Sequence, residues 1–168
     1  VTCTGFMVGP HTVGTAAHCI YNKELGGWAT SAFVTPGLDG LNAPFGTERA
    51  TSFEVSPAWV ANQELEADYA AITLATDALG KETGWFDLTP PTDSQLATGV
   101  FATAGYGQSE QYGFLWRMPT PQRLVDYDSS FIAYVWGTSA GESGAAIFNP
   151  SPTAGRYQVV GILKGAFG

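Results

Sequence analysis

Turn-forming residues interrupt this chain so often that short strands are favoured over long helices. The sequence has 21 glycines and 10 prolines among 168 residues, scattered without a period. Between them lie short apolar or β-branched stretches, several with period-two alternation. The only helix-like stretch is 62–68, so the sequence predicts an all-β protein of sandwich or barrel type. The expected strands are 4–8, 12–15, 28–35, 49–55, 69–75, 99–104, 114–117, 123–126, 131–136, 145–148 and 157–163.

One segment, 81–95, is the best internal boundary because it combines mixed charges with a Pro-Pro pair. It predicts two halves of similar size, 1–88 and 89–168, with five or six strands each. No fixed-period repeat is visible, so a solenoid or propeller is not expected.

Composition excludes several classes of function. Hydrophobic residues make up 45% and charged residues 13%, which excludes a disordered chain. The net charge is −8 and the seven basic residues are spread singly, so we expect no nucleic-acid partner. No apolar run is long enough for a membrane span.

The two cysteines, Cys3 and Cys19, weakly favour a bridge over free thiols. A bridge closing that loop would contribute about 3 kcal/mol and would imply an oxidising, extracellular compartment. Two Cys and two His without finger spacing predict no metal site, and nothing in the sequence predicts another cofactor.

A histidine with small neighbours is the first candidate for chemistry. His18 follows Ala16 and Ala17 and precedes Cys19. It is either a buried, hydrogen-bonded core residue or a general base, since imidazole titrates near neutral pH.

An aspartate at the start of an apolar strand is the second candidate. Asp68 precedes the stretch 69–74. Such a residue is usually a cap or a solvated turn residue. The functional alternative is an acceptor that fixes the tautomer of an imidazole.

A serine between glycines is the third candidate. Ser143 lies in Gly141-Glu142-Ser143-Gly144, before the apolar stretch 145–148. The motif is either an ordinary hairpin turn or an exposed nucleophile with backbone N–H groups beside it. Each pattern alone is weak, but the order His, Asp, Ser is one of the known orders of catalytic triads.

These motifs resemble those of the chymotrypsin-fold serine endopeptidases. The segments that carry the resemblance are CTGFMVGPHTVGTAAHC, DYAAITL and GTSAGESGAAIFN. Within the family the chain most resembles the bacterial glutamyl-endopeptidase-like branch, through TAGYGQSEQYGFLWR and SGAAIFN. The resemblance implies two six-stranded antiparallel β-barrels with the active site in the cleft between them.

The resemblance also implies a role for each candidate residue. His18 becomes the general base and acid, Asp68 its orienter and Ser143 the nucleophile. The N–H groups of Gly141 and Ser143 become the oxyanion hole, and Cys3–Cys19 a disulfide. No metal or cofactor is implied.

The chain departs from the family pattern at both ends and near the serine. Only two residues precede Cys3 and the chain stops at Gly168, so we expect a processed or incompletely represented protein, with missing segments or a propeptide. Glu142 stands where Asp or a polar residue is usual; it could pair with a freed N-terminus, for which Val1 is poorly placed.

The resemblance further assigns the walls of a specificity pocket. Gly137 offers no carboxylate, so a trypsin-like preference is not expected, and Thr138 matches a hydroxyl that contacts an acidic side chain. Leu163 replaces a pocket histidine. Lys164 is either a solvent-facing strand end or a cation that binds an acidic side chain or couples to Asp68. The assigned residues are Gly137, Thr138, Leu163, Lys164, Gly165 and Ala166.

The sequence therefore predicts a secreted, monomeric serine endopeptidase that acts on proteins or peptides, with an acidic or apolar preference. The alternative is a catalytically inactive relative that serves as a binding module. A carbohydrate-binding sandwich is a poorer third class, because the aromatic residues are spread over the expected strands and are better explained as core.

Overall fold

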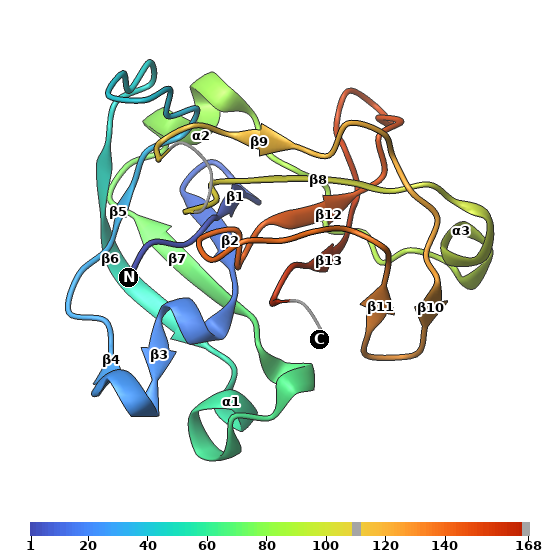
Figure 1. The fold of residues 1–168 in the computed structure, drawn as a ribbon. Coiled ribbons are helices and arrows are strands. Elements are labelled where there is room, and N and C mark those ends of the chain that lie inside the picture. The colour runs from blue at the N-terminus through green and yellow to red at the C-terminus, as the bar shows by residue number, and fades with distance from the viewer. Residues whose placement is uncertain (109–111, 166–168) are drawn as a thin grey trace.

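The N-terminal half contains a curled five-stranded antiparallel sheet. The structure is a computed structural model that describes residues 1–108 and 112–165. The strand order is β1-β2-β7-β6-β5, and it lies on the left in Figure 1. The strands are β1 (Phe6–Met7), β2 (Thr12–Thr15), β5 (Phe33–Val34), β6 (Glu48–Val55) and β7 (Ala70–Leu74).

The C-terminal half contains a four-stranded antiparallel sheet with the order β13-β12-β8-β9. Two small ribbons, β3-β4 and β10-β11, complete the described strands. The bounds are β8 (Ala102–Gly105), β9 (Trp116–Arg117), β12 (Ala146–Phe148), β13 (Val159–Ile162), β3 (Tyr21–Asn22), β4 (Gly27–Trp28), β10 (Asp126–Tyr127) and β11 (Ile132–Ala133).

The prediction of a single helix-like stretch at 62–68 is wrong. An α-helix, α1 (Pro57–Asn62), ends where that stretch begins, and a 3₁₀ turn, η3 (Leu65–Ala67), lies inside it. Pro57 favours an earlier start, because its fixed φ suits the first helical turn. Two more short helices, α2 (Ala78–Thr83) and α3 (Asp93–Thr98), flank the predicted boundary, and 3₁₀ turns η1 (Ala17–Cys19) and η2 (Lys23–Leu25) lie nearer the N-terminus.

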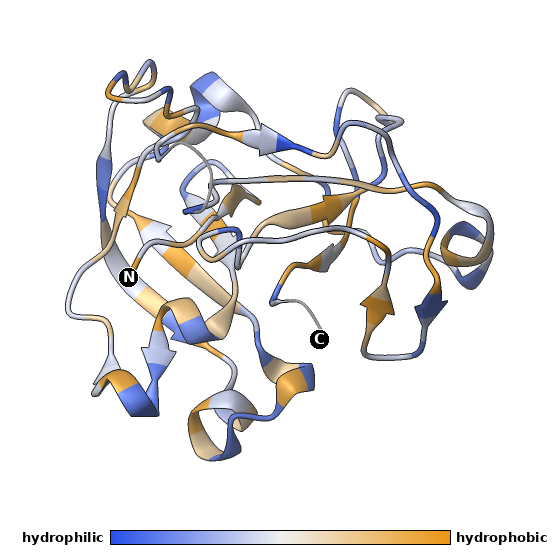
Figure 2. Ribbon diagram, in the orientation of Figure 1, coloured by the Kyte–Doolittle hydropathy of each residue, from blue (hydrophilic) through white to orange (hydrophobic). Residues whose placement is uncertain are grey.

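Each half has its own hydrophobic core. Val13, Ile72, Leu74 and Trp59 belong to the buried cluster of the first half. A second cluster, of Phe101, Ala145, Ile147 and Leu163, lies in the other half. Figure 2 shows β7 and β12 in the orange of hydrophobic residues, whereas β10 is blue, as expected for strands that line a core and for a ribbon edge at the surface.

The all-β prediction is confirmed, and the two six-stranded barrels stay a prediction. Within 1–108 and 112–165, no strand pairing joins the edge strands β1 and β5 of the larger sheet. Backbone contacts do join the halves. The N–H of Thr4 donates to the carbonyl of Ser143 at 2.9 Å, and that of Asp87 donates to the carbonyl of Tyr157 at 2.9 Å.

Candidate active site

His18 and Asp68 form a directly bonded pair. The His18 Nδ1 lies 2.8 Å from Oδ2 of Asp68, and the His18 backbone N–H donates to Oδ1 at 2.9 Å. Asp68 is buried, with 8% of its surface exposed, and His18 is partly buried. Because both carboxylate oxygens are occupied by the same residue, the imidazole is fixed in position and its other nitrogen, Nε2, is left free to act.

Local structure holds each member of this pair. η1 carries His18 directly after β2, and the disulfide Cys3–Cys19, as predicted, ties the neighbouring residue to the start of the chain. η3 ends at Asp68, whose N–H donates to the Leu65 carbonyl at 3.4 Å.

Trp59 lies next to the His18 ring, tilted against it, a neighbour that sequence reasoning missed. Its ring centroid lies 6.3 Å from that of His18, and its indole N–H donates to the Tyr21 carbonyl at 2.8 Å. The tryptophan is buried in the core of the first half. Nothing in the sequence separates it from the other core aromatics.

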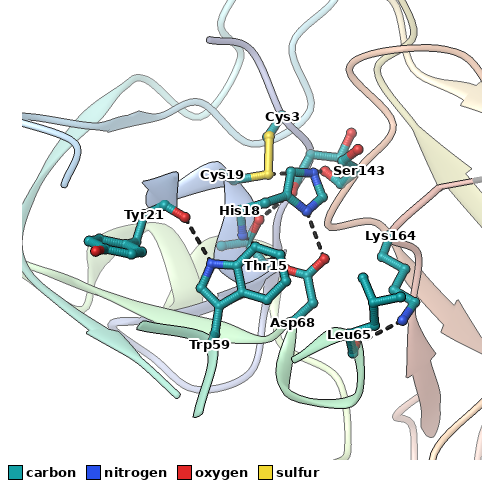
Figure 3. Close-up of polar contacts among 11 residues, drawn as sticks. Cys3, Thr15, His18, Cys19, Tyr21, Trp59, Leu65, Asp68, Ser143 and Lys164 are labelled. Carbon is teal, nitrogen blue, oxygen red and sulfur yellow. Dashed lines mark hydrogen bonds and ion pairs between the residues drawn. A yellow bond between two sulfur atoms is a disulfide. The ribbon is translucent and has the colours of Figure 1, made fainter. Parts of the chain in front are cut away.

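Ser143 lies beside the imidazole, on the side away from Asp68 (Figure 3). It comes from the loop 139–145, here called the serine loop, which leads into β12. The side chain is partly buried, and its hydroxyl has no hydrogen-bond partner among the described residues. A nucleophile–base hydrogen bond commonly tightens only when substrate binds, so this geometry suits a free nucleophile.

Two glycines are required by the shape of the serine loop. Gly141 has φ +99° and Gly144 has φ +89°, the left-handed region that side chains rarely adopt. A Cβ on Gly144 would clash with the Thr15 hydroxyl and the Thr4 carbonyl, and one on Gly141 with the Tyr106 carbonyl. The Gly-x-Ser-Gly pattern therefore reflects close backbone approach rather than a simple hairpin.

Two backbone N–H groups of the serine loop are available to a ligand. The Ala140 carbonyl accepts from Gln108, and the Glu142 carbonyl accepts from Ala145. In a trans peptide the C=O and N–H point in opposite directions, so the N–H groups of Gly141 and Ser143 point away from these partners. Neither group donates to an acceptor within residues 1–108 and 112–165. Two such donors can bind an oxyanion when both point to one position.

Thr4 fixes the serine loop, and sequence reasoning did not identify it. Its hydroxyl donates to the Gly141 carbonyl at 2.9 Å and accepts from the Tyr106 N–H at 2.9 Å. Its carbonyl in turn accepts from the Thr15 hydroxyl at 2.8 Å. The two bonds of the Thr4 hydroxyl connect residues more than a hundred positions apart, which no local pattern reveals.

Glu142 is buried within the serine loop. One carboxylate oxygen accepts from the Ser139 N–H at 2.8 Å, and no cation pairs with it among the described residues. Val1 is 94% exposed, in keeping with the expectation that it is no partner. Burial raises the pKa of Tyr134 to about 12, and the nearby Glu142 charge acts in the same direction.

The predicted pocket residues are placed differently from one another. A Cβ on Gly137 or Gly165 would meet open space, and Thr138 is partly buried. Leu163 is only 6% exposed and packs in the core of the C-terminal half, so a substrate contact by this side chain stays a prediction. Ala166 lies outside the described residues. Lys164 is partly buried, and its ammonium donates to the Leu65 carbonyl.

A cavity of about 1320 Å³ lies beside the site but is not the predicted pocket. His18 and Cys19 contribute to its wall, together with residues of β1 and β5 such as Phe6 and Phe33. None of the predicted pocket residues that the structure describes lines it, and neither does Ser143.

One group of potential metal donors occurs in the described part of the chain: Cys3, His18 and Cys19. The two sulfurs are joined to each other, so they are not the thiolates that bind a metal. The donor set does not fit a metal centre. No helix among residues 1–108 and 112–165 is long and apolar enough to cross a membrane.

By its fold and site, the protein falls into the class of all-β proteins in which a hydrogen-bonded His–Asp pair lies next to a serine-bearing loop. A family model described as Trypsin matches residues 1–168, and the chain belongs to that family.

Individual relatives agree with this assignment. A glutamyl endopeptidase of Bacillus licheniformis is 33% identical over 150 residues, 89% of this chain and 46% of that protein. A Bacillus subtilis protein named extracellular metalloprotease is 29% identical over 157 residues, 94% of this chain and 49% of that protein. The chain thus spans about half the length of these curated relatives.

Solved structures show the same fold. A Glu endopeptidase in complex with MPD has a TM-score of 0.85 at 24% identity, covering 98% of this chain and 74% of the other. The protease Anisep from Arthrobacter nicotinovorans has a TM-score of 0.78 at 20% identity, covering 99% and 78%.

Proposed function

We propose that this chain is the peptidase part of a secreted serine endopeptidase, with two barrels and a cleft between them. The observation that carries the proposal is the His18–Asp68 pair, whose free imidazole nitrogen faces the Ser143 side. Family membership supports the same reaction class.

The reaction begins when the Ser143 hydroxyl attacks the carbonyl carbon of a peptide bond. The O–C bond forms while the hydroxyl proton passes to Nε2 of His18. Asp68 holds the Nδ1–H tautomer and stabilises the imidazolium. The carbonyl oxygen becomes an oxyanion and accepts hydrogen bonds from the Gly141 and Ser143 N–H groups.

The intermediate then collapses and the C–N bond breaks. The leaving amine takes the proton from His18, and an acyl group stays on Ser143. Water, deprotonated by the same imidazole, attacks this ester; the bond between the acyl carbon and Oγ of Ser143 breaks, Oγ takes the proton from His18, and the acid product leaves. Every proton that leaves a nucleophile returns to a leaving group, so no cofactor is needed.

The preferred side chain before the cleaved bond is acidic or apolar in this proposal. The relative from Bacillus licheniformis is named for glutamyl specificity, and Thr138 can offer a hydroxyl to a carboxylate. Leu163, in contrast, offers no polar atom.

Hydrolysis of casein and of a peptide library by the wild type and Ser143→Ala tests the proposal. We expect the wild type to cut both, with the cleaved sites enriched in Glu and Asp or in apolar residues, and the variant to cut neither. A folded wild type that turns over no casein would contradict the proposal and favour the inactive binding module.

A further inference from the structure

The Lys164 side chain extends from the C-terminal half to the turn that carries Asp68. Its ammonium donates to the Leu65 carbonyl at 2.8 Å (Figure 3). The same carbonyl accepts the Asp68 N–H at 3.4 Å. One acceptor therefore joins the lysine to the residue that orients His18.

The backbone next to Lys164 is fixed to the serine loop. The carbonyl of Leu163 accepts from the Gly144 N–H at 2.6 Å, and the N–H of Leu163 donates to Ala145 at 2.8 Å. Lys164 thus follows directly after a residue bonded to the loop that carries Ser143, and its ammonium contacts the turn before Asp68.

The ammonium is held in place without being neutralised. It lies 3.9 Å from the centroid of the Phe131 ring, a cation–π contact. No carboxylate of the described residues lies within 4.0 Å of it. The charged groups that act on it are Asp68 and Glu66. The ammonium thus has one backbone acceptor and one ring face, and it keeps a charge on which Asp68 and Glu66 act.

We propose that Lys164 is a positioning residue that ties the Leu65–Ala67 turn to the serine loop and so fixes Asp68 and His18 relative to Ser143. This inference rests on the proposed function, because positioning matters only if these three residues react together. It assigns Lys164 a role inside the protein rather than the substrate contact predicted from the resemblance.

The pH dependence of the lysine provides a signature that a merely structural role would lack. Burial lowers the pKa of Lys164, and the carboxylates of Asp68 and Glu66 oppose that shift only in part. The ammonium therefore loses its proton at a lower pH than a free lysine does. We expect kcat of the wild type to fall at alkaline pH, because the Lys164 ammonium then loses its charge. In Lys164→Arg, kcat should stay level over the same pH range, since guanidinium keeps its charge.

Four variants separate charge, hydrogen bonding and fold. Lys164→Arg keeps the cation, Lys164→Gln keeps a donor only, and Lys164→Met keeps neither. Lys23→Met is the matched control, because the Lys23 ammonium also donates to a backbone carbonyl, that of Ala61 at 2.6 Å, on an exposed surface.

We expect kcat of Lys164→Met to fall about tenfold with KM nearly unchanged, equivalent to ~1.4 kcal/mol in the barrier. Lys164→Gln should be intermediate, Lys164→Arg should restore kcat, and Lys23→Met should match the wild type. Equal kcat values for wild type and Lys164→Met, or restoration by Gln but not by Arg, would overturn the inference.

Hydrogen exchange of the peptide covering 65–69 tests the contact between Lys164 and the Leu65–Ala67 turn, and this measurement does not require an active enzyme. Exchange should be faster in Lys164→Met and in Lys164→Gln than in the wild type, and unchanged in Lys23→Met. Unchanged exchange in all variants would overturn the inference even in an active enzyme. A wild type that hydrolyses no casein contradicts the proposed function instead, and the exchange result then decides about the tie alone.

Discussion

The two parts of the candidate site are held by different kinds of contact. The histidine arm, defined as residues 3–19 and 65–68, contains a disulfide and two hydrogen bonds between His18 and Asp68. The serine loop has no side-chain bond from Ser143 to this arm among the described residues; Thr4 and Leu163 place it through its backbone.

This difference indicates which half of the chemistry is preassembled. The base and its orienter come from the same half of the chain and meet directly. The nucleophile comes from the other half, so its position depends on contacts between the halves. Substitutions in the histidine arm should therefore change the orientation or tautomer of the His18 imidazole. Substitutions around the serine loop should instead change the distance between His18 and Ser143.

The largest effect is expected from Asp68→Asn. The carboxamide has only one oxygen, so it cannot accept both the His18 backbone N–H and the Nδ1–H of the ring. Its NH₂ group favours the tautomer with the proton on Nε2, and kcat should fall roughly 10⁴-fold with the fold intact. Steady-state kinetics with a peptide substrate measures this. Glu66→Gln, two positions earlier on η3, is the control and should keep most activity. A loss of less than about tenfold in Asp68→Asn would mean that the bonded pair is not the catalytic base.

Gly144→Ala is the matching disruption of the serine loop. The new methyl group clashes with Thr4 and Thr15 and forces an alanine to φ +89°. We expect a loss of about 3 kcal/mol in the free energy of unfolding, measured by urea denaturation, and a large loss of activity. Gly9→Ala, where a Cβ would make only an ordinary contact with Thr12, is the control. A Gly144→Ala variant with the same free energy of unfolding as the wild type would show that the serine loop can shift to accommodate the methyl group.

Removal of the disulfide tests how much of the arm depends on covalent closure. Replacing both Cys3 and Cys19 with Ser should lower the free energy of unfolding by about 3 kcal/mol, because the unfolded chain regains the entropy of an open loop. Under conditions in which the double variant is folded, its activity should persist, because the two hydrogen bonds between His18 and Asp68 remain. Complete loss of activity in a folded double variant would show that the bridge positions His18 directly.

The smallest effect is expected from Thr4→Val. The variant keeps the shape but loses the bonds to the Gly141 carbonyl and from the Tyr106 N–H. Stability should fall by ~1–2 kcal/mol, and kcat should fall more than KM rises, because the oxyanion donors shift. Thr51→Val removes a comparable surface bond to Thr73 and should leave kcat unchanged. Equal kcat values for Thr4→Val and the wild type would mean that the loop holds its shape alone.

Local patterns predict most of the strands and the three candidate residues, since each has a characteristic neighbourhood, but β3 lies outside every expected strand. The pairing of Cys3 with Cys19 is confirmed, and the structure brings His18 and Asp68 into hydrogen-bond contact. The catalytic roles of these residues remain proposals, and Ser143 is placed beside His18 without a bond to it.

The misses have physical causes. The expected strand 28–35 is instead split between β4 and β5, because Trp28 pairs with Tyr21 while Phe33 pairs with Arg49. α3 is not among the expected elements, although Thr92 and Gln95 form a capping box, which is the sequence signature of a helix start. Thr4 contacts Tyr106, about a hundred positions away, and period and propensity carry no information about such contacts.

Covalent labelling by a fluorophosphonate tests the central claim most directly. The probe should modify the wild type at one residue, Ser143, identified by peptide mass spectrometry. Ser143→Ala should not react, and Asp68→Asn should react far more slowly. A folded wild type that stays unlabelled, or a label that persists in Ser143→Ala, would contradict the account.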